Sequence, residues 1–248
     1  MNPEGWLYLI PQLIPVAALT AAVALCGWAI RAITAGAALT GFVLTVVLCA
    51  AAGPSTFFPI AAVFLLTLLC TRIGRRKKER LGMGEHKGGR GALQILANVG
   101  VPALCVAPLL FAEHARYALM AAAAAALAEA AGDTVSSELG QVLGGRPRLI
   151  TTLRHVPAGQ DGGISPLGTI ASVTAILIVC MVCQWSGLLL PRYLWTAFTA
   201  AFFGTVVDSL LGATLERPGR LGNNSVNFSS SACAAGLTLA IVLVQRWL

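Results

Sequence analysis

Charged residues are scarce in this sequence. Only 11% of its 248 residues are charged, against about 25% in a typical soluble domain, while 57% are hydrophobic. No polar stretch is long enough to form a separate soluble domain. The composition therefore excludes an ordinary soluble protein. It predicts one integral-membrane domain over residues 1–248, with the fold of an all-α polytopic membrane protein.

The sequence also lacks the pattern of a removable signal peptide. The first residues, MNPEGWLYLI, have no basic region before the apolar ones, so we expect them to begin the first membrane span. The seven cysteines lie in apolar runs, where Cys packs as a small hydrophobic residue. The Cys180-x-x-Cys183 pair lies in such a run, so we assign it no redox or metal chemistry.

Eight apolar runs are long enough to cross a membrane as helices, which takes roughly 20 residues each. The fifth run is short and rich in Ala, which favours close contact between helices over a lipid-facing surface. Small residues of this kind also allow a homodimer. The predicted spans are residues 7–30, 32–52, 56–73, 93–112, 116–131, 165–189, 192–215 and 226–247.

Basic residues are distributed unevenly between the two ends of these spans. The linkers at 72–92, 132–164 and 216–225 lie on one side and hold most of the 17 Lys and Arg residues. The other side keeps only Arg116, Arg192 and Arg246. The positive-inside rule places the polar loops in the cytoplasm and both termini outside. We expect a multi-pass protein of the inner (cytoplasmic) membrane of a bacterium.

A polar, Gly-rich segment at residues 129–169 interrupts the apolar pattern. Glu129 and Asp133 are four residues apart, so they share a face if the helix continues, and Glu138 follows them. Carboxylates at a membrane boundary are costly unless they are paired or bind a metal. Mg²⁺ takes one or two carboxylates and completes its shell with water and substrate phosphates. We predict a Mg²⁺ site here; the alternative is a salt-bridge network with Arg146 or Arg148 of the same segment.

The loop after these acids has features of an anion site. Its glycines let backbone N–H groups approach a phosphate, and its Arg and Thr side chains add donors. The spacing of Gly140 and Gly145 matches a Walker A motif, but Arg146-Pro147 replaces the required Lys-Ser/Thr, which excludes a P-loop. The predicted phosphate or nucleotide ligands in this loop are Arg146, Arg148, Thr151, Thr152, Arg154, Gly159, Gly162 and Gly163.

Polar residues also lie inside or beside later spans. Asp208 lies within the seventh span at a depth that matches Asp133, and a buried carboxylate in a membrane helix is a functional-site candidate. Three asparagines at the start of span eight exceed what helix capping requires, and we expect them to contact a base, ribose or phosphate. They are Asn223, Asn224 and Asn227.

Basic residues precede the fourth span. The run RRKKER at 75–80 is typical of a topology signal and of a contact with anionic lipids. Lys87 and Arg90 flank two glycines and lead into a helix that carries Gln94 and Asn98. We expect Lys87 and Arg90 to bind phosphate. The two amides face either a cavity or another helix.

Four segments together resemble a known membrane family. They are KGGRGALQILANVG, EAAGDTVSSELGQVLGGRPRLITTLRHVPAGQDGGISPLGTIAS, DSLLGATLE and NNSVNF. They occur in the order found in an integral-membrane family catalogued as domain of unknown function 92, which includes a plant phytyl-phosphate kinase and the animal transmembrane protein 19. The Gly-Asp-Thr helix end and its basic loop are also distantly similar to CTP-dependent polyprenol kinases such as dolichol kinase.

The resemblance implies an enzyme: a membrane kinase that transfers phosphate from a nucleoside triphosphate, CTP, to an isoprenyl monophosphate, with Mg²⁺ as cofactor. Such an acceptor is already ionised, so the site must mainly position two polyanions and neutralise their charge. The implied catalytic residues are Asp133, Glu138, Arg90 and Arg154. The implied metal ligands are Asp133, Glu138, Asp208 and Glu129.

Other functions remain open on the sequence. One is a transporter or flippase of a phosphorylated lipid or organic anion, for which acids and amides within the spans would be suitable. Another is a CTP-dependent lipid-phosphate cytidylyltransferase, which would use the same ligands. A non-enzymatic scaffold leaves the polar segment unexplained.

Overall fold

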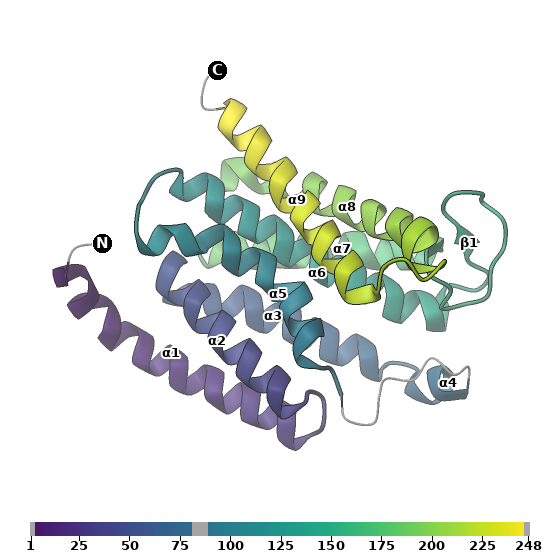
Figure 1. Ribbon diagram of the computed structural model, residues 1–248, viewed down its shortest axis with the longest axis horizontal. Coiled ribbons are helices and arrows are strands. Elements are labelled where there is room, and N and C mark those ends of the chain that lie inside the picture. Colours follow the sequence, from purple (N-terminus) through teal and green to yellow (C-terminus); the bar gives the residue numbers. More distant parts are fainter. Residues whose placement is uncertain (1–2, 81–88, 246–248) are drawn as a thin grey trace.

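Long helices dominate the computed structural model, which describes residues 3–80 and 89–245 (Figure 1). Eight helical segments in this part of the chain are long and apolar enough to cross a membrane, which confirms the predicted all-α polytopic fold. The main helices are α1 (Pro3–Ala29), α2 (Ala35–Ala52), α3 (Phe57–Arg72), α5 (Ala92–Val106), α6 (Arg116–Leu143), α7 (Pro166–Trp185), α8 (Leu194–Leu211) and α9 (Asn223–Gln245).

Short elements connect or extend these helices. The 3₁₀ turns η2 and η3 extend α5 and α8, and the π-helical turn η4 follows α8 directly. Strands β1 and β2 form a small antiparallel pair in which Arg148 lies opposite Ile164. The short elements are η1 (Pro54–Thr56), α4 (Arg75–Arg80), η2 (Ala107–Leu110), β1 (Arg148–Leu149), β2 (Gly163–Ile164), η3 (Pro191–Tyr193) and η4 (Gly212–Glu216).

Helix α6 is the centre of the bundle. In an apolar 18-residue stretch of α6, 89% of the residues are buried, against 11% in the corresponding stretch of α1, and α6 packs against α3, α5, α7, α8 and α9. The run of alanines at 121–126 is almost completely buried. Small side chains let neighbouring helix backbones approach closely, which is how helices associate where lipid supplies no hydrophobic driving force between them. This confirms the predicted role of the Ala-rich segment.

The structure corrects the predicted end of the fifth span. We predicted that the span ends near residue 131 and that a loop follows, but α6 continues to Leu143. Asp133 and Glu138 therefore lie on the helix and not in a loop. The polar residues of this last part face protein: Glu138, for example, accepts hydrogen bonds from Thr71, Lys78 and Arg90. Hydropathy alone misreads such a segment because its polar groups are satisfied by other helices.

The two ends of the bundle differ in what they carry. Both termini lie toward one end, while α4, the segment 144–165 and the turn 217–222 gather at the other, which we name the loop end (Figure 1). This arrangement agrees with an even number of spans. The placement of the loop end in the cytoplasm stays a prediction from the charge distribution.

Backbone pairing places Arg90 at the loop end. The segment before α5 lies beside the connection between α1 and α2, where Ile33 and Arg90 form an isolated parallel bridge. Arg90 N–H donates to the carbonyl of Ala32 at 3.0 Å, and Thr34 N–H donates to the carbonyl of Arg90 at 3.0 Å. Thr34 also caps α2 through its side chain, which accepts from Ala37 N–H at 3.1 Å. The position of Arg90 is thus fixed from both sides.

Candidate functional site

A polar cavity of about 460 Å³ lies at the loop end. Its walls come from α6, α8, η4, the start of α9, the segment 159–165 and the residues around Arg90. Nine of the residues predicted from the sequence line it. They are Arg90, Asp133, Glu138, Gly159, Gly162, Gly163, Asp208, Asn223 and Asn227.

Carboxyl groups of α6 and α8 meet in this cavity. The side chain of Asp133 contacts that of Asp208, which also accepts a hydrogen bond from Ser230 Oγ of α9 at 3.1 Å. Glu129 lies one turn earlier on α6 and is 1% exposed. Ser231 Oγ donates to Glu129 Oε2 at 2.5 Å, whereas Glu129 Oε1 has no hydrogen-bond partner among the described residues. Three acids, the buried Glu129 and the half-buried Asp133 and Asp208, thus lie within about one helical turn of each other, and Asp133 and Asp208 meet as their matching depths predicted.

A glycine on α8 makes this concentration possible. A Cβ atom at Gly204 would lie 2.6 Å from Cγ of Glu129 and 3.0 Å from Cβ of Ala234. Real Cβ atoms do not approach other heavy atoms so closely. The missing side chain therefore lets α8 lie directly against the acidic face of α6 and against α9.

The arrangement of Asp133 and Asp208 is suitable for a divalent cation. Two carboxylates in contact repel each other unless a cation or a proton lies between them. Mg²⁺ needs only one or two carboxylates, since water and substrate phosphates complete its shell. No group of three or more His, Cys, Asp or Glu with a metal-binding arrangement occurs in residues 3–80 and 89–245. The predicted Mg²⁺ site therefore depends on this aspartate pair, with the unpaired oxygen of Glu129 nearby.

The Gly-rich segment closes another side of the cavity. Gly162 adopts a positive φ of 73°, and a Cβ atom there would lie 2.5 Å from the backbone N of Ala213 in η4. Gly212 is equally close on the other side, because its Cβ would lie 2.9 Å from the backbone N of Gly162. The two backbones therefore pack against each other without side chains between them. This contact fixes the loop beside Asp161 and Glu216, which also line the cavity.

Several predicted loop residues lie elsewhere. Within the described residues, the lining of the polar cavity omits five of them: Arg146, Arg148, Thr151, Thr152 and Arg154. The described lining also omits two predicted residues on helices, Glu129 of α6 and Asn224 of α9. Arg148 Nη1 donates to the carbonyl of Leu153 at 2.8 Å, and Thr152 Oγ1 accepts from Arg154 N–H at 3.4 Å, so these groups bond within the loop. The five from Arg146 to Arg154 are exposed. The predicted ligand Lys87 lies outside the described residues.

Glu138 is the centre of an ion-pair cluster. Its Oε1 accepts hydrogen bonds from Thr71 Oγ1 at 2.9 Å and from Arg90 Nη2 at 3.2 Å. Its Oε2 accepts from Lys78 Nζ at 2.5 Å. The salt-bridge alternative is therefore present for this acid, with Lys78 and Arg90 as the cations in place of Arg146 or Arg148. Sequence reasoning missed Lys78 because nothing distinguishes it from the other basic residues of the run at 75–80.

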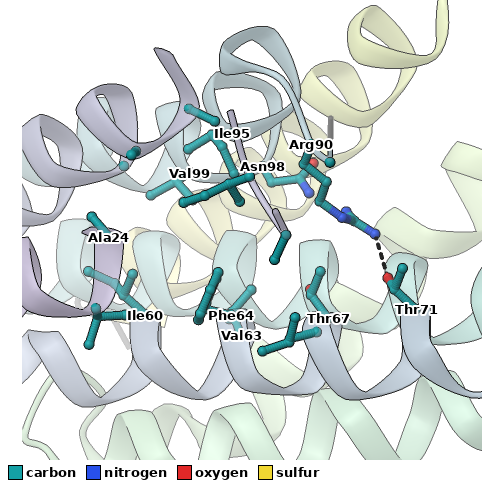
Figure 2. A pocket seen from close by; sticks show the side chains of 18 of the residues that line it. Ala24, Ile60, Val63, Phe64, Thr67, Thr71, Arg90, Ile95, Asn98 and Val99 are labelled. Carbon is teal, nitrogen blue, oxygen red and sulfur yellow. Dashed lines mark hydrogen bonds between the residues drawn. The ribbon is translucent and has the colours of Figure 1, made fainter. Parts of the chain in front are cut away.

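A second, mostly apolar cavity of about 640 Å³ lies between α1, α2, α3 and α5, and we name it the chamber. Figure 2 shows its wall: Ala24 from α1, Ile60, Phe64 and Thr67 from α3, and Ile95 from α5. Drug-sized ligands occupy pockets of about 300–1,000 Å³, so the chamber is large enough for a substantial apolar group. The sequence contained no signal for it, because most of its lining residues are ordinary apolar residues of the spans.

The chamber and the polar cavity meet. Arg90, Glu138 and Gln141 line both of them. At the same level Asn98 of the chamber accepts a hydrogen bond from Asn227 Nδ2 of the polar cavity at 3.3 Å. Figure 2 shows the Arg90 side chain extending past the chamber to Thr71. An apolar compartment and a polar compartment thus share one boundary, which we name the junction (Arg90, Glu138 and Gln141).

Comparison with known proteins gives the family. Residues 18–235 match the family model described as Integral membrane protein DUF92. An uncharacterized membrane protein of Synechocystis sp. is 32% identical over 199 residues, which cover 79% of this chain and 77% of the relative. One from Methanocaldococcus jannaschii is 34% identical over 171 residues, 68% of each chain.

A plant relative is more distant. Protein VTE6, chloroplastic, of Arabidopsis thaliana is 27% identical over 211 residues, which cover 79% of this chain and 62% of that protein. No solved structure gives a significant match to the chain. Because the family model covers the chain from α1 into α9, the protein is a member of the DUF92 family of integral membrane proteins.

Proposed function

We propose that this protein is a membrane kinase that transfers a phosphate from a nucleoside triphosphate, CTP, to an isoprenyl monophosphate and so forms the diphosphate. One observation carries the proposal: an apolar chamber and a polar cavity share the junction. A substrate that combines a long apolar chain with a polyanionic head needs two such compartments at one boundary. The family resemblance found in the sequence, to a phytyl-phosphate kinase and to CTP-dependent polyprenol kinases, supports the same reaction.

The chamber is the proposed place of the isoprenyl chain. Its lining from α1, α2, α3 and α5 is mostly apolar, and its charged residues lie near the loop end. Burial in it stabilises a bound chain by about 0.8 kcal/mol per CH₂ group relative to water. The head would then lie at the junction, where Arg90 offers charge-assisted hydrogen bonds to phosphate oxygens.

The polar cavity is the proposed place of the nucleotide and Mg²⁺. Five carboxylates line it, from Asp133, Glu138, Asp161, Asp208 and Glu216, against one basic residue, Arg90. A triphosphate cannot bind in such a negative cavity without cations. Mg²⁺ on Asp133 and Asp208 would neutralise the phosphates of the donor as they approach the acceptor.

The remaining polar groups are suitable for the nucleoside and its phosphates. The Gly-rich segment 159–163 lines the cavity, and those of its backbone N–H groups that do not donate within the loop would be the donors to phosphate. Asn223 and Asn227 line the cavity from the start of α9, and Asn227 Oδ1 has no hydrogen-bond partner among the described residues. A buried amide oxygen of this kind is available to a ligand donor.

The proposed step is a direct phosphoryl transfer. An oxygen of the lipid phosphate forms a bond to the γ-phosphorus, and the bond between that phosphorus and the bridging oxygen breaks. The nucleoside diphosphate leaves with the bonding electron pair. Because the acceptor oxygen is already ionised, no general base is required. The protein accelerates the reaction by holding the two phosphates in position and by offsetting their negative charge. This explains a site with arginine, aspartate and glycine but no histidine in its described lining.

Two labels test the proposal. Purified protein in lipid nanodiscs is given Mg²⁺ and geranylgeranyl or phytyl monophosphate with CTP or ATP labelled at either the γ- or the α-phosphate. We expect γ-label in a lipid diphosphate. Label from the α-phosphate in the lipid, with release of pyrophosphate, would identify a cytidylyltransferase instead. No label from either position across several chain lengths would refute both enzymes and leave a transporter.

A further inference from the structure

The two lysines of α4 have different surroundings. Lys78 is 4% exposed, and its Nζ donates to the carbonyls of Cys70 and Thr71 at 3.1 and 3.3 Å as well as to Glu138. Its neighbour Lys77 is exposed and donates to the carbonyl of Val142 at 2.6 Å. A lysine is almost never fully buried unless its charge is paired. Lys78 is therefore not an ordinary member of a topology signal.

The position of Lys78 indicates a ligand. It lines the chamber at the loop end, and the described lining there contains five basic side chains and one carboxylate, Glu138. Topology and contact with anionic lipids explain exposed basic residues at this end of the spans, but they do not require Lys78 to be buried against Glu138 in the cavity wall. A lipid with one anionic head has the matching distribution of charge. The basic lining residues are Arg31, Arg72, Arg75, Lys78 and Arg90.

We propose that Lys78, Arg90 and Thr71 form the binding site for the head of a single-chain lipid monophosphate, and that Glu138 occupies this site until the lipid arrives. This inference rests on the proposed function, because it locates the head of the proposed acceptor. The side-chain oxygens of Glu138 already accept from Lys78 Nζ, Arg90 Nη2 and Thr71 Oγ1, which are the donors a phosphate would use.

Charge favours the exchange. A phosphate monoester carries about −1.5 to −2 charge at pH 7, against −1 for a carboxylate. The lipid phosphate therefore compensates the surrounding cations better than Glu138 does. The carboxylate in turn keeps Lys78 and Arg90 paired while no lipid is bound, since breaking a buried ion pair leaves a costly unpaired charge.

The first experiment compares the two lysines of α4. Equilibrium binding of radiolabelled geranylgeranyl monophosphate to nanodisc-embedded protein is measured without nucleotide. Lys78→Met keeps the volume of the side chain but removes its charge, and we expect the affinity to fall about 10- to 100-fold. Affinity for geranylgeraniol, which lacks the phosphate, should not change. The matched control Lys77→Met should leave both affinities unchanged.

The second experiment separates a ligand site from a purely structural ion pair. Glu138→Gln removes the competing charge, so we expect roughly fivefold tighter binding of the monophosphate and a lower melting temperature of the lipid-free protein. Weaker or unchanged binding by Glu138→Gln would overturn the placeholder role. This variant also keeps the proposal testable if Lys78→Met does not fold.

Competition experiments identify which kind of phosphate compound the site binds. Inorganic phosphate and nanodiscs of phosphatidylglycerol should compete only weakly with the monophosphate. Equal competition by inorganic phosphate would overturn a lipid site, and equal competition by phosphatidylglycerol would overturn a single-chain ligand. Because no nucleotide is present, these results are independent of phosphoryl transfer. Transfer that proceeds normally in Lys78→Met, with unchanged lipid affinity, would overturn this inference alone.

Discussion

The chamber and the polar cavity share three residues but have opposite charge. The described lining of the chamber contains five basic residues and one acid, whereas that of the polar cavity contains five acids and one basic residue. The chamber is built mainly from α1, α2, α3 and α5, and the polar cavity mainly from α6 onward. Under the proposed function, the difference teaches how two polyanions could be held together in one membrane protein: fixed cations of the protein would bind the lipid phosphate, and the nucleotide would require a dissociable cation.

The largest expected effect comes from removing a carboxylate of the polar cavity. Asp133→Asn should lower the rate of phosphoryl transfer by on the order of 10³-fold. The substitution leaves Asp208 as the only carboxylate of the pair that can bind Mg²⁺. The rate is measured with γ-labelled CTP, and folding is checked by gel filtration and circular dichroism. Glu113→Gln serves as the control, since Glu113 pairs with Arg116 at the start of α6, away from the polar cavity. A fully active Asp133→Asn variant would remove Asp133 from the metal site.

A smaller effect is expected where the Gly-rich segment meets η4. Gly162→Ala should raise the KM for CTP by about 30-fold, since the new Cβ collides with Ala213 and moves the loop that lines the cavity. Gly145→Ala is a matched control. Gly145 has a similar positive φ of 66° but nothing within 4 Å of its Cβ position, so it reports backbone strain alone. Equal effects of the two substitutions would show that the close contact is unimportant.

The smallest effect is expected from filling the chamber. Ala24→Leu adds bulk where Figure 2 shows Ala24 facing the cavity, and it should raise the KM for the longest lipid substrate roughly tenfold. Shorter isoprenyl monophosphates and CTP should be affected less. The neighbouring exposed residue provides the control as Leu25→Ala. A uniform loss across chain lengths would contradict the placement of the chain in the chamber.

Features set by local pattern could be predicted from the sequence. Eight apolar runs gave eight spans, because each helix must satisfy its backbone within the bilayer. The meeting of Asp133 and Asp208 followed from equal depth in two spans. The Gly-rich segment was placed beside the acids correctly, and Gly159, Gly162 and Gly163 line the same cavity.

Features that depend on packing between distant segments could not be predicted. The chamber needs small and apolar side chains from four helices, and each of them is unremarkable in its own span. Lys78 differs from Lys77 only in the direction of its side chain from α4, which no run of basic residues reveals. Arg146, Arg148 and Arg154 are close to the acids in sequence, yet their loop extends away from the cavity.

The low burial of α1 has a consequence for the rate of exchange with the surrounding lipid. This helix forms part of the chamber wall, yet only 11% of the residues in an apolar 18-residue stretch of it are buried, and it packs mainly against α2. Displacing it breaks far fewer contacts than displacing α6. A chain that leaves beside α1 passes from one hydrocarbon environment to another and avoids the cost of about 0.8 kcal/mol per CH₂ group of entering water. Under the proposed function, turnover would then follow the sideways movement of a single helix and be sensitive to bilayer thickness and fluidity.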